Sequence, residues 1–184
     1  MNLISLVRML KEQGVKIESA WGADFSPPLI EAARKDAKES LHTEDLERIR
    51  FHVARNEALI DELSAASGKP EEELSGAFDL VLGVNTFRYC HRLAKSQECA
   101  TDIFRLLTDG GICIMIDMNR RFPLFRSRFT KSVEDPAECY LPSLDEYEAP
   151  FQQAGFEILQ KENFCWIPHS AGPTLVFFCR ALST

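Results

Sequence analysis

Two polar side chains stand at the ends of apolar, strand-like stretches of the chain. Asp24 lies near the end of the stretch 17–25, and Asn85 ends the stretch 78–85. Open α/β sheets bind their ligands at the carboxyl ends of strands, where an acid can accept hydrogen bonds from both hydroxyls of a ribose. We therefore predict that Asp24 binds a ribose, with capping of the next helix as its alternative role. The side-chain amide of Asn85 could orient a ligand; its alternative role is that of a turn residue.

Further candidates follow Asn85 on the same rim of the predicted sheet. Arg88 and Tyr89 are placed to contact a substrate. His91 is a weak candidate for a general base, because an imidazole exchanges protons near neutral pH. A histidine in a loop is more often simply solvated. Group-transfer reactions also often need little general acid–base catalysis, because holding the acceptor in line with the transferred group supplies much of the rate.

A basic segment at 119–131 contains five basic residues and three phenylalanines but no acid. One interpretation is a lid whose arginines, Arg120 among them, recognise an anionic or aromatic substrate. The alternative is an exposed basic loop that balances the acidic remainder of the chain, and the sequence favours this alternative slightly.

Helices and strands alternate along the chain, which predicts a mostly parallel sheet with helices on both faces. The last two strands are joined by a short connection and must therefore be antiparallel. Ser26 is expected to cap the second helix with its hydroxyl, and Gly14 and Gly155 are expected to end helices. The expected helices are 3–12, 26–41, 94–107 and 143–155, and the expected strands are 17–25, 48–54, 78–85, 112–117, 156–164 and 174–181.

Composition restricts the class of protein. A chain of 184 residues is expected to form one domain, 1–184. The net charge of −7, from 28 acids and 21 bases, argues against nucleic acid as a partner. The six cysteines form no CxxC pair, so we expect reduced thiols and no metal site. No apolar run could span a membrane, and the first residues, Met1-Asn2-Leu3-Ile4, lack the basic and apolar regions of a signal peptide, so a cytoplasmic location is expected.

Four segments, in order, resemble the class I S-adenosylmethionine-dependent methyltransferases. Each is weak alone, but together they cover nearly the whole chain. They are Gly22-Ala-Asp-Phe-Ser-Pro27 with Leu29-Ile-Glu-Ala-Ala-Arg34, then Phe78-Asp-Leu-Val-Leu-Gly-Val-Asn85, then Ile103-Phe-Arg-Leu-Leu-Thr-Asp-Gly-Gly111, and finally Phe151-Gln-Gln-Ala-Gly-Phe156 with the closing hairpin.

The resemblance implies a Rossmann-like α/β sheet, S-adenosylmethionine as cofactor and methyl transfer to a small-molecule acceptor. It places Phe25 beside the adenine and Asn85 beside the methionine moiety and the acceptor. The family often carries an acid near the position of Arg55 to accept a hydrogen bond from the adenine. Because arginine cannot accept a hydrogen bond, Asn56 or Glu57 would have to substitute.

The family's first strand and its glycine-rich turn have no counterpart, since the chain opens directly on a helix and Gly110-Gly111 precedes a strand instead of following one. In the family's strand order, 3-2-1-4-5-7-6, strand one lies between strands two and four. Its absence would leave two sheet fragments with unpaired inner edges. We expect direct pairing of the two fragments, a strand from another chain in an oligomer, or a longer natural protein.

Three hypotheses about function remain open from the sequence. The first is an S-adenosylmethionine-dependent methyltransferase. The second is a non-catalytic partner or scaffold of the same fold, or a fragment that is inactive alone. The third is a nicotinamide-dependent oxidoreductase, against which the antiparallel final hairpin counts.

Overall fold

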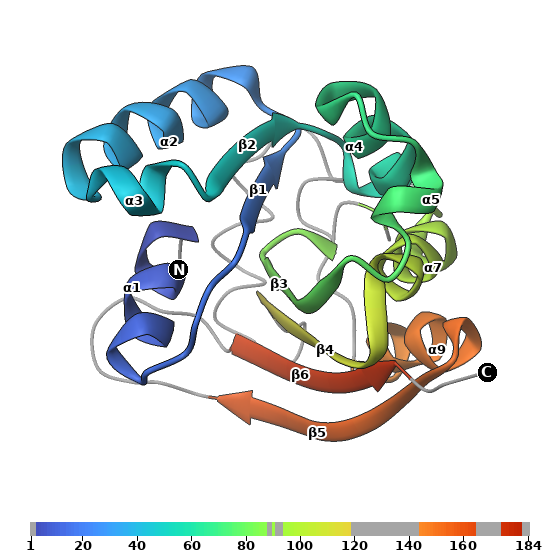
Figure 1. Ribbon diagram of the computed structural model, residues 1–184. Coiled ribbons are helices and arrows are strands. Elements are labelled where there is room, and N and C mark those ends of the chain that lie inside the picture. Colours follow the sequence, from blue (N-terminus) through green and yellow to red (C-terminus); the bar gives the residue numbers. More distant parts are fainter. Residues whose placement is uncertain (1–2, 88–89, 91–93, 119–143, 165–173, 182–184) are drawn as a thin grey trace, which may run out of the picture. The chain divides into compact units, whose positions relative to one another are not determined.

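A computed structural model describes residues 3–87, 90, 94–118, 144–164 and 174–181. The chain forms two compact units (Figure 1). The N-terminal unit comprises residues 1–55 and 61–69, and the C-terminal unit comprises residues 56–60 and 70–184. Each unit contains its own sheet.

The N-terminal unit is built on two parallel strands, β1 (Ala20–Asp24) and β2 (Ile49–Val53). Their register places Ala20 beside Ile49 and Asp24 beside Val53, so both strands end together. The helices of this unit are α1 (Leu3–Glu12), α2 (Pro27–Ser40), α3 (Thr43–Leu46) and most of α4 (Leu59–Ser67).

The two faces of the β1–β2 sheet carry different side chains. On one face, a Cβ atom on Gly22 would lie 2.9 Å from the Phe51 ring and 3.3 Å from the Leu3 side chain. Glycine therefore allows α1 to approach this face closely. On the opposite face, the rings of Trp21 and His52 pack with their centroids 4.7 Å apart.

The start of α2 differs from the expectation. The side chain of Ser26 makes no capping hydrogen bond. Instead, the backbone N–H of Ser26 donates to Oδ1 of Asp24 at 2.8 Å. The prediction that Ser26 caps the helix with its hydroxyl is therefore wrong, because the carboxylate two residues earlier orders this turn. Gly14 does follow the end of α1, with φ at 78°.

The C-terminal unit contains a four-stranded sheet in the order β3-β4-β6-β5. β3 (Phe78–Val84) pairs in parallel with β4 (Leu107–Met118), and β6 (Thr174–Ala181) pairs antiparallel with both β4 and β5 (Phe156–Phe164). The remaining described elements are η1 (Asn56–Ala58), α5 (Glu71–Leu74), α7 (Ser96–Leu106) and α9 (Leu144–Ala154).

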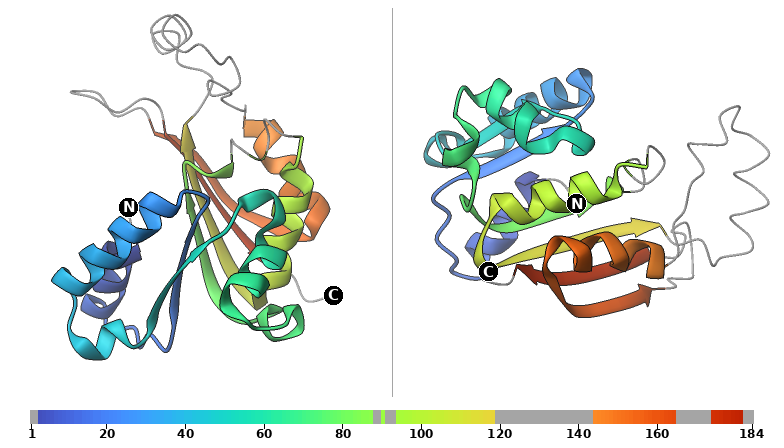
Figure 2. Two further views of the ribbon diagram at one scale, coloured as in Figure 1. Left: turned by 90° about the horizontal axis from the view of Figure 1, so that it is seen from above. Right: turned by 90° about the vertical axis from the view of Figure 1, so that its right-hand side faces the viewer.

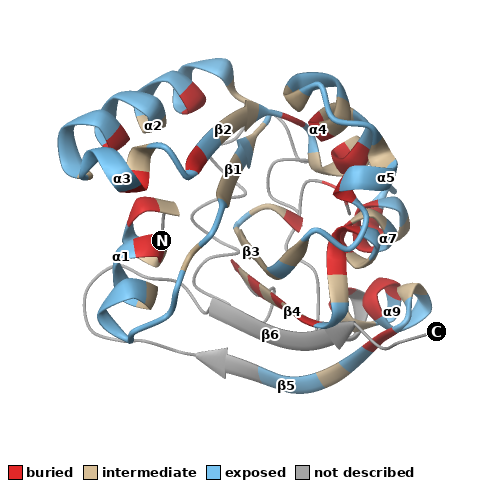
Figure 3. Ribbon diagram, in the orientation of Figure 1, coloured by how far each residue is buried: buried red, intermediate tan, exposed pale blue. Residues whose placement is uncertain are grey.

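One face of the C-terminal sheet is covered by α7 and α9 (Figure 2). Side chains alternate along β4, so that Cys113, Met115 and Asp117 are buried while the residues between them are only half-buried. Buried residues of α7, α9 and the start of β5 continue this core (Figure 3), and aromatic rings make up much of it. The packed ring pairs are Phe87–Tyr147, Phe87–Phe151, Phe151–Phe156 and Phe104–Phe156.

The strand order confirms the expected α/β sheet with an antiparallel C-terminal hairpin, and β5 and β6 have the predicted boundaries. β4 begins five residues earlier than expected, at Leu107 instead of Ile112; its register with β3 shifts where Gly110 turns with φ at 76°. The continuous apolar run of 78–85 is typical of a buried strand. β3 is nevertheless only half-buried, because β4 is its one neighbour among the described strands.

Direct pairing of the two sheet fragments is one of the three outcomes expected for the missing strand; among the described strands, β1 and β3 belong to different sheets. Within the described part of the chain, no helix is long and apolar enough to cross a membrane. Cys90, Cys99 and Cys113 are buried and are not joined in disulfides.

We predict that the N-terminal unit loses stability as the pH falls from about 7 to about 5. Burial lowers the pKa of His52, a hydrogen bond to the backbone of Ala66 opposes this, and the charges of Arg34 and Arg50 add to the lowering. Below the ordinary histidine pKa of about 6.5, the unfolded chain takes up a proton more readily than the folded one, so acid favours unfolding.

The measurement is urea unfolding followed by Trp21 fluorescence in a Trp166→Phe background. His52→Gln should flatten the pH dependence between pH 7 and 5. Asp45 does not interfere, because its hydrogen bond with Lys11 lowers its pKa below an already acidic value. An equal pH dependence with and without the imidazole would contradict the assignment.

Candidate functional site

Asp24 is the last residue of β1, and its carboxylate is half-buried. Oδ1 accepts the hydrogen bond from Ser26, and Oδ2 has no hydrogen-bond partner among the described residues. The backbone is held as well, because the N–H of Ala54 donates to the carbonyl oxygen of Asp24 at 3.1 Å. Asp24 therefore orders the turn into α2 with one oxygen of its carboxylate.

Exposed apolar residues lie close to Asp24 in the chain and in the sheet register. Phe25 follows it and is 53% exposed, and Val53, its neighbour in register, is 39% exposed. Leu29, in the first turn of α2, is 58% exposed. Apolar groups that gather at the surface commonly mark a binding site. We call Asp24, Phe25, Leu29 and Val53 the carboxyl-edge patch of the N-terminal unit.

Arg55 follows β2 and is held by Glu62 from α4. Both the backbone N–H and the guanidinium of Arg55 donate to the Glu62 carboxylate. Burial of Glu62 opposes its ionisation, but the hydrogen bonds and charge of Arg55 prevail and lower the pKa of Glu62. An acid thus does lie beside Arg55, although it comes from α4 and is occupied by the arginine. Sequence reasoning missed it, and the seven-residue spacing carries no signal that would have found it.

Asn56 and Glu57 lie in the short helix η1, where both are half-buried. η1 packs against α7 within the C-terminal unit. The amide of Asn56 and the carboxylate of Glu57 both contain oxygens that can accept hydrogen bonds.

Asn85 directly follows β3 and is exposed. Its backbone N–H donates to the carbonyl oxygen of Ile116 at 2.8 Å, and its φ is 55°. This left-handed conformation is one that asparagine adopts more readily than most residues. The turn interpretation of Asn85 is therefore correct for its backbone, and its exposed amide remains available to a ligand.

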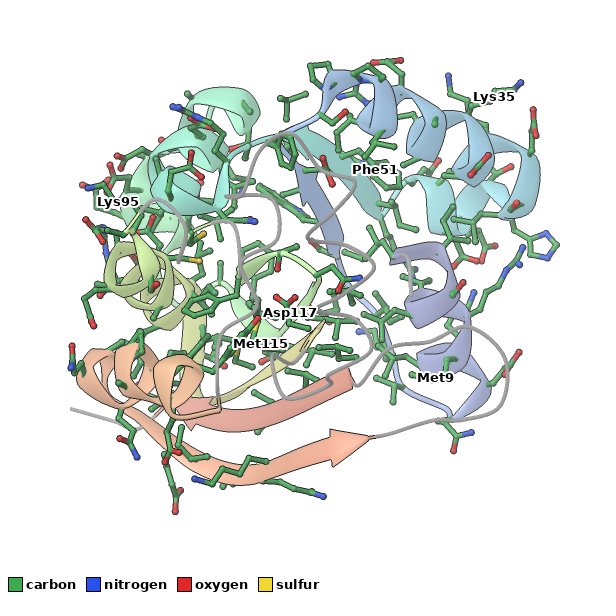
Figure 4. All side chains as sticks on the ribbon, turned by 180° about the vertical axis from the view of Figure 1, so that it is seen from behind. Met9, Lys35, Phe51, Lys95, Met115 and Asp117 are labelled. Carbon is green, nitrogen blue, oxygen red and sulfur yellow. The ribbon has the colours of Figure 1, made fainter. Side chains whose placement is uncertain are left out.

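A buried pair lies beside Asn85 in the C-terminal unit. The hydroxyl of Tyr147 donates to Oδ2 of Asp117, and the two side chains are 0% and 1% exposed. Burial, followed by the Asp117 charge, raises the pKa of Tyr147. Figure 4 shows Asp117 beside Met115 on β4. Sequence reasoning passed over this acid, whose signal is its place at the end of the most apolar strand in the chain.

The predicted site residues divide between the two units. Asp24 and Phe25 belong to the N-terminal unit, whereas Asn56, Glu57 and Asn85 belong to the C-terminal unit. The other candidates lie outside the described residues: Arg88, Tyr89, His91 and Arg120.

Hollows in the two units lie at the opposite ends of the strands from these residues. In the N-terminal unit, a cavity of about 90 Å³ is lined by residues that include Val7, Asp45, Arg48 and Ile49. In the C-terminal unit, a shallow groove runs past Gly76 and the start of β4. Ligands of open α/β sheets bind at the carboxyl ends, so neither hollow is the candidate cofactor site.

Solved structures similar to this chain share its fold. One is an S-adenosylmethionine-dependent methyltransferase from Methanosarcina mazei, with 15% identity and a TM-score of 0.69 over 96% of this chain and 86% of that one. A second is the Haloferax volcanii complex with the Trm112 methyltransferase activator, with 17% identity and a TM-score of 0.68 over 97% and 78% of the two chains. A third is the [4+2]-cyclase SpnF, with 14% identity and a TM-score of 0.66 over 97% and 70%.

At these identities the similarity shows the fold alone, and the cyclase illustrates that one fold serves more than one chemistry. No curated protein matches the chain. A family match, however, covers residues 4–171, which include every described strand up to β5 and all the predicted site residues. The chain belongs to the methyltransferase domain family, of the class I S-adenosylmethionine-dependent type.

Proposed function

We propose that this protein transfers a methyl group from S-adenosylmethionine to a small-molecule acceptor. The observation that carries the proposal is the carboxyl-edge patch, in which a carboxylate with one unengaged oxygen lies among exposed apolar side chains. A nucleoside needs this combination, because its ribose hydroxyls donate hydrogen bonds while its base is a flat apolar surface with polar edges. The residues present therefore fit the nucleoside part of the cofactor.

Each site residue receives a role in this proposal. Asp24 accepts hydrogen bonds from the ribose, Phe25 covers one face of the adenine, and Asn56 or Glu57 accepts from the adenine amino group. Asn85 orients the methionine moiety or the acceptor at the end of β3. When bound, the cofactor supplies an electrophilic methyl group on a positively charged sulfur, and the chain's contribution is to hold the acceptor in line with it.

Acceptor recognition is proposed for Arg88, Tyr89 and Arg120, and proton removal for His91. The net charge of −7 supports a small molecule over nucleic acid as the acceptor. The match to the methyltransferase domain family supports the cofactor.

Substitutions of Asp24 separate its two roles. Asp24→Asn keeps an oxygen that accepts from the Ser26 N–H, but its NH2 group cannot accept from a ribose hydroxyl. Asp24→Ala removes both functions. We expect each variant to bind S-adenosylhomocysteine, the demethylated product, at least tenfold more weakly in calorimetric titration. Only Asp24→Ala should also lose roughly 0.5–2 kcal/mol of stability, the usual range for a lost helix cap.

Leu41→Ala, at the far end of α2, serves as a control that should leave affinity unchanged. Unchanged affinity in Asp24→Asn would remove the ribose assignment. An intact chain that gives no heat with either S-adenosylmethionine or its product would contradict the proposed function of the chain alone and favour the non-catalytic alternative.

Substitutions of Asn85 separate its backbone conformation from its side-chain chemistry. At φ 55°, Asn85→Ala should lower the free energy of unfolding by about 1 kcal/mol, whereas Asn85→Gly should leave it nearly unchanged. If the amide orients a ligand, both variants lose cofactor or acceptor binding, Asn85→Gly included. Chemical denaturation and product titration on the same samples test this. A glycine variant with full affinity would reduce Asn85 to a turn residue.

A second candidate function, as an interaction partner, is favoured by the edges of the C-terminal sheet. β5 is protected in the manner of a solvent-facing edge, by charged residues such as Lys161 and by a register shift near Leu159. In β3 the one charged residue, Asp79, and the one register shift, between Phe78 and Leu80, both lie at the start of the strand, so that Leu80–Val84 has neither device. Among the described strands, β3 pairs with β4 alone. We propose that a second copy of the chain pairs with β3, antiparallel about a twofold axis.

Pairing geometry identifies a variant that tests this proposal. Because Val84 lies opposite Ile116 and the Asn85 N–H bonds to Ile116, the backbone groups of Val84, Leu82 and Leu80 point away from β4. Leu82→Pro removes an outward N–H without removing one that bonds to β4. Sedimentation should show a dimer for the parent chain and a folded monomer for this variant. A parent chain that stays monomeric up to high concentration would overturn the proposal.

A further inference from the structure

Asp117 and Tyr147 form a buried polar contact inside a largely apolar core. Tyr147 comes from α9 and Asp117 from the carboxyl end of β4. Burial of a carboxylate is unfavourable unless hydrogen bonds replace the lost water, and the tyrosine hydroxyl supplies one such bond. An apolar residue at position 117 would fill the core equally well, so packing alone does not explain an aspartate here.

This pair is connected to Asn85 along two routes. Along the backbone, Asn85 donates its N–H to Ile116, the residue that precedes Asp117. Through side chains, the Tyr147 ring packs on the fully buried ring of Phe87 with centroids 4.8 Å apart, and Phe87 is two residues from Asn85. The hydrogen bond to Asp117 sets where the Tyr147 ring lies, and the ring in turn supports Phe87.

Close packing on the sheet restricts movement of the residues at the end of β3. A Cβ atom on Gly83 would lie 2.5 Å from Cε of Met115 and 2.8 Å from Oγ1 of Thr86. Met115 and Thr86 therefore close over β3 immediately before Asn85. The Asp117–Tyr147 hydrogen bond is thus a polar contact within the packed residues that adjoin the end of β3.

We infer that Asp117 and Tyr147 are positioning residues, which hold the segment Asn85–Phe87 in the conformation that a ligand at the carboxyl end of β3 requires. This inference rests on the proposed function. It names the residues that hold Asn85, which is itself proposed to orient the methionine moiety or the acceptor. Neither side chain touches a ligand in this role. Both act through Phe87 and through the backbone of β4.

The test compares Tyr147→Phe with Phe156→Leu. Tyr147→Phe keeps the ring that packs on Phe87 but removes the hydroxyl. Phe156→Leu damages the same aromatic core, where Phe156 packs on Phe104 and Phe151 rather than on Phe87. Amide exchange of Asn85 is followed by NMR, with the chains brought to equal free energy of unfolding by urea. We expect exchange about tenfold faster in Tyr147→Phe than in Phe156→Leu, as loss of a hydrogen bond to a buried charged group allows.

A second pair of variants tests the acceptor side of the contact. Asp117→Asn retains an oxygen that accepts from Tyr147 and should keep most of the protection of Asn85, whereas Asp117→Leu should not. Equal exchange in Tyr147→Phe and Phe156→Leu, or equal exchange in the two Asp117 variants, would overturn the positioning role.

Titration with S-adenosylhomocysteine separates this inference from the proposed function. Tyr147→Phe should weaken binding severalfold while Phe156→Leu should not. If the parent chain binds no product, the proposed function fails, and the exchange result still decides whether Asp117 and Tyr147 hold Asn85. If the parent binds and Tyr147→Phe binds equally well, the positioning role in ligand binding is wrong.

Discussion

Parallel pairing of β3 with β4 is the interaction on which the C-terminal unit depends. Because both strands run the same way, their carboxyl ends meet at one edge, and the hydrogen bond from Asn85 to Ile116 is the last rung between them. That rung leaves Asn85 exposed and turns Asp117 inward beneath α9. An outward amide and an inward carboxylate are thus two results of the same pairing.

The N-terminal unit repeats this arrangement on a smaller scale. β1 and β2 also end in register, with Asp24 beside Val53. Here the acid orders the turn into α2, with Oδ1 accepting the hydrogen bond from the Ser26 N–H. The sequence presented a role in this turn and the proposed ribose binding as alternatives, but the turn uses only one of the two carboxylate oxygens.

Local signals account for most of what could be predicted. β5 and β6 have the expected bounds because glycine, proline and alternating apolar residues mark their ends, and Gly155 ends α9 with φ at 106°. Contacts between distant elements could not be predicted. The Glu62–Arg55 and Asp117–Tyr147 contacts depend on how α4 and α9 pack, and the half-burial of β3 depends on a neighbour that an apolar run alone does not specify. The prediction that Asp24 and Asn85 are site residues rests on their place at strand ends, where open α/β sheets bind their ligands.

The left-handed backbone of Asn85 restricts how this position can evolve. Residues that tolerate a φ of 55° are mainly glycine, asparagine and aspartate. This position can therefore carry glycine, which offers no side chain, asparagine, whose amide donates and accepts hydrogen bonds, or aspartate, whose carboxylate only accepts them. Descendants of this protein could change the chemistry offered there, or give it up, while the backbone of the strand end stayed the same.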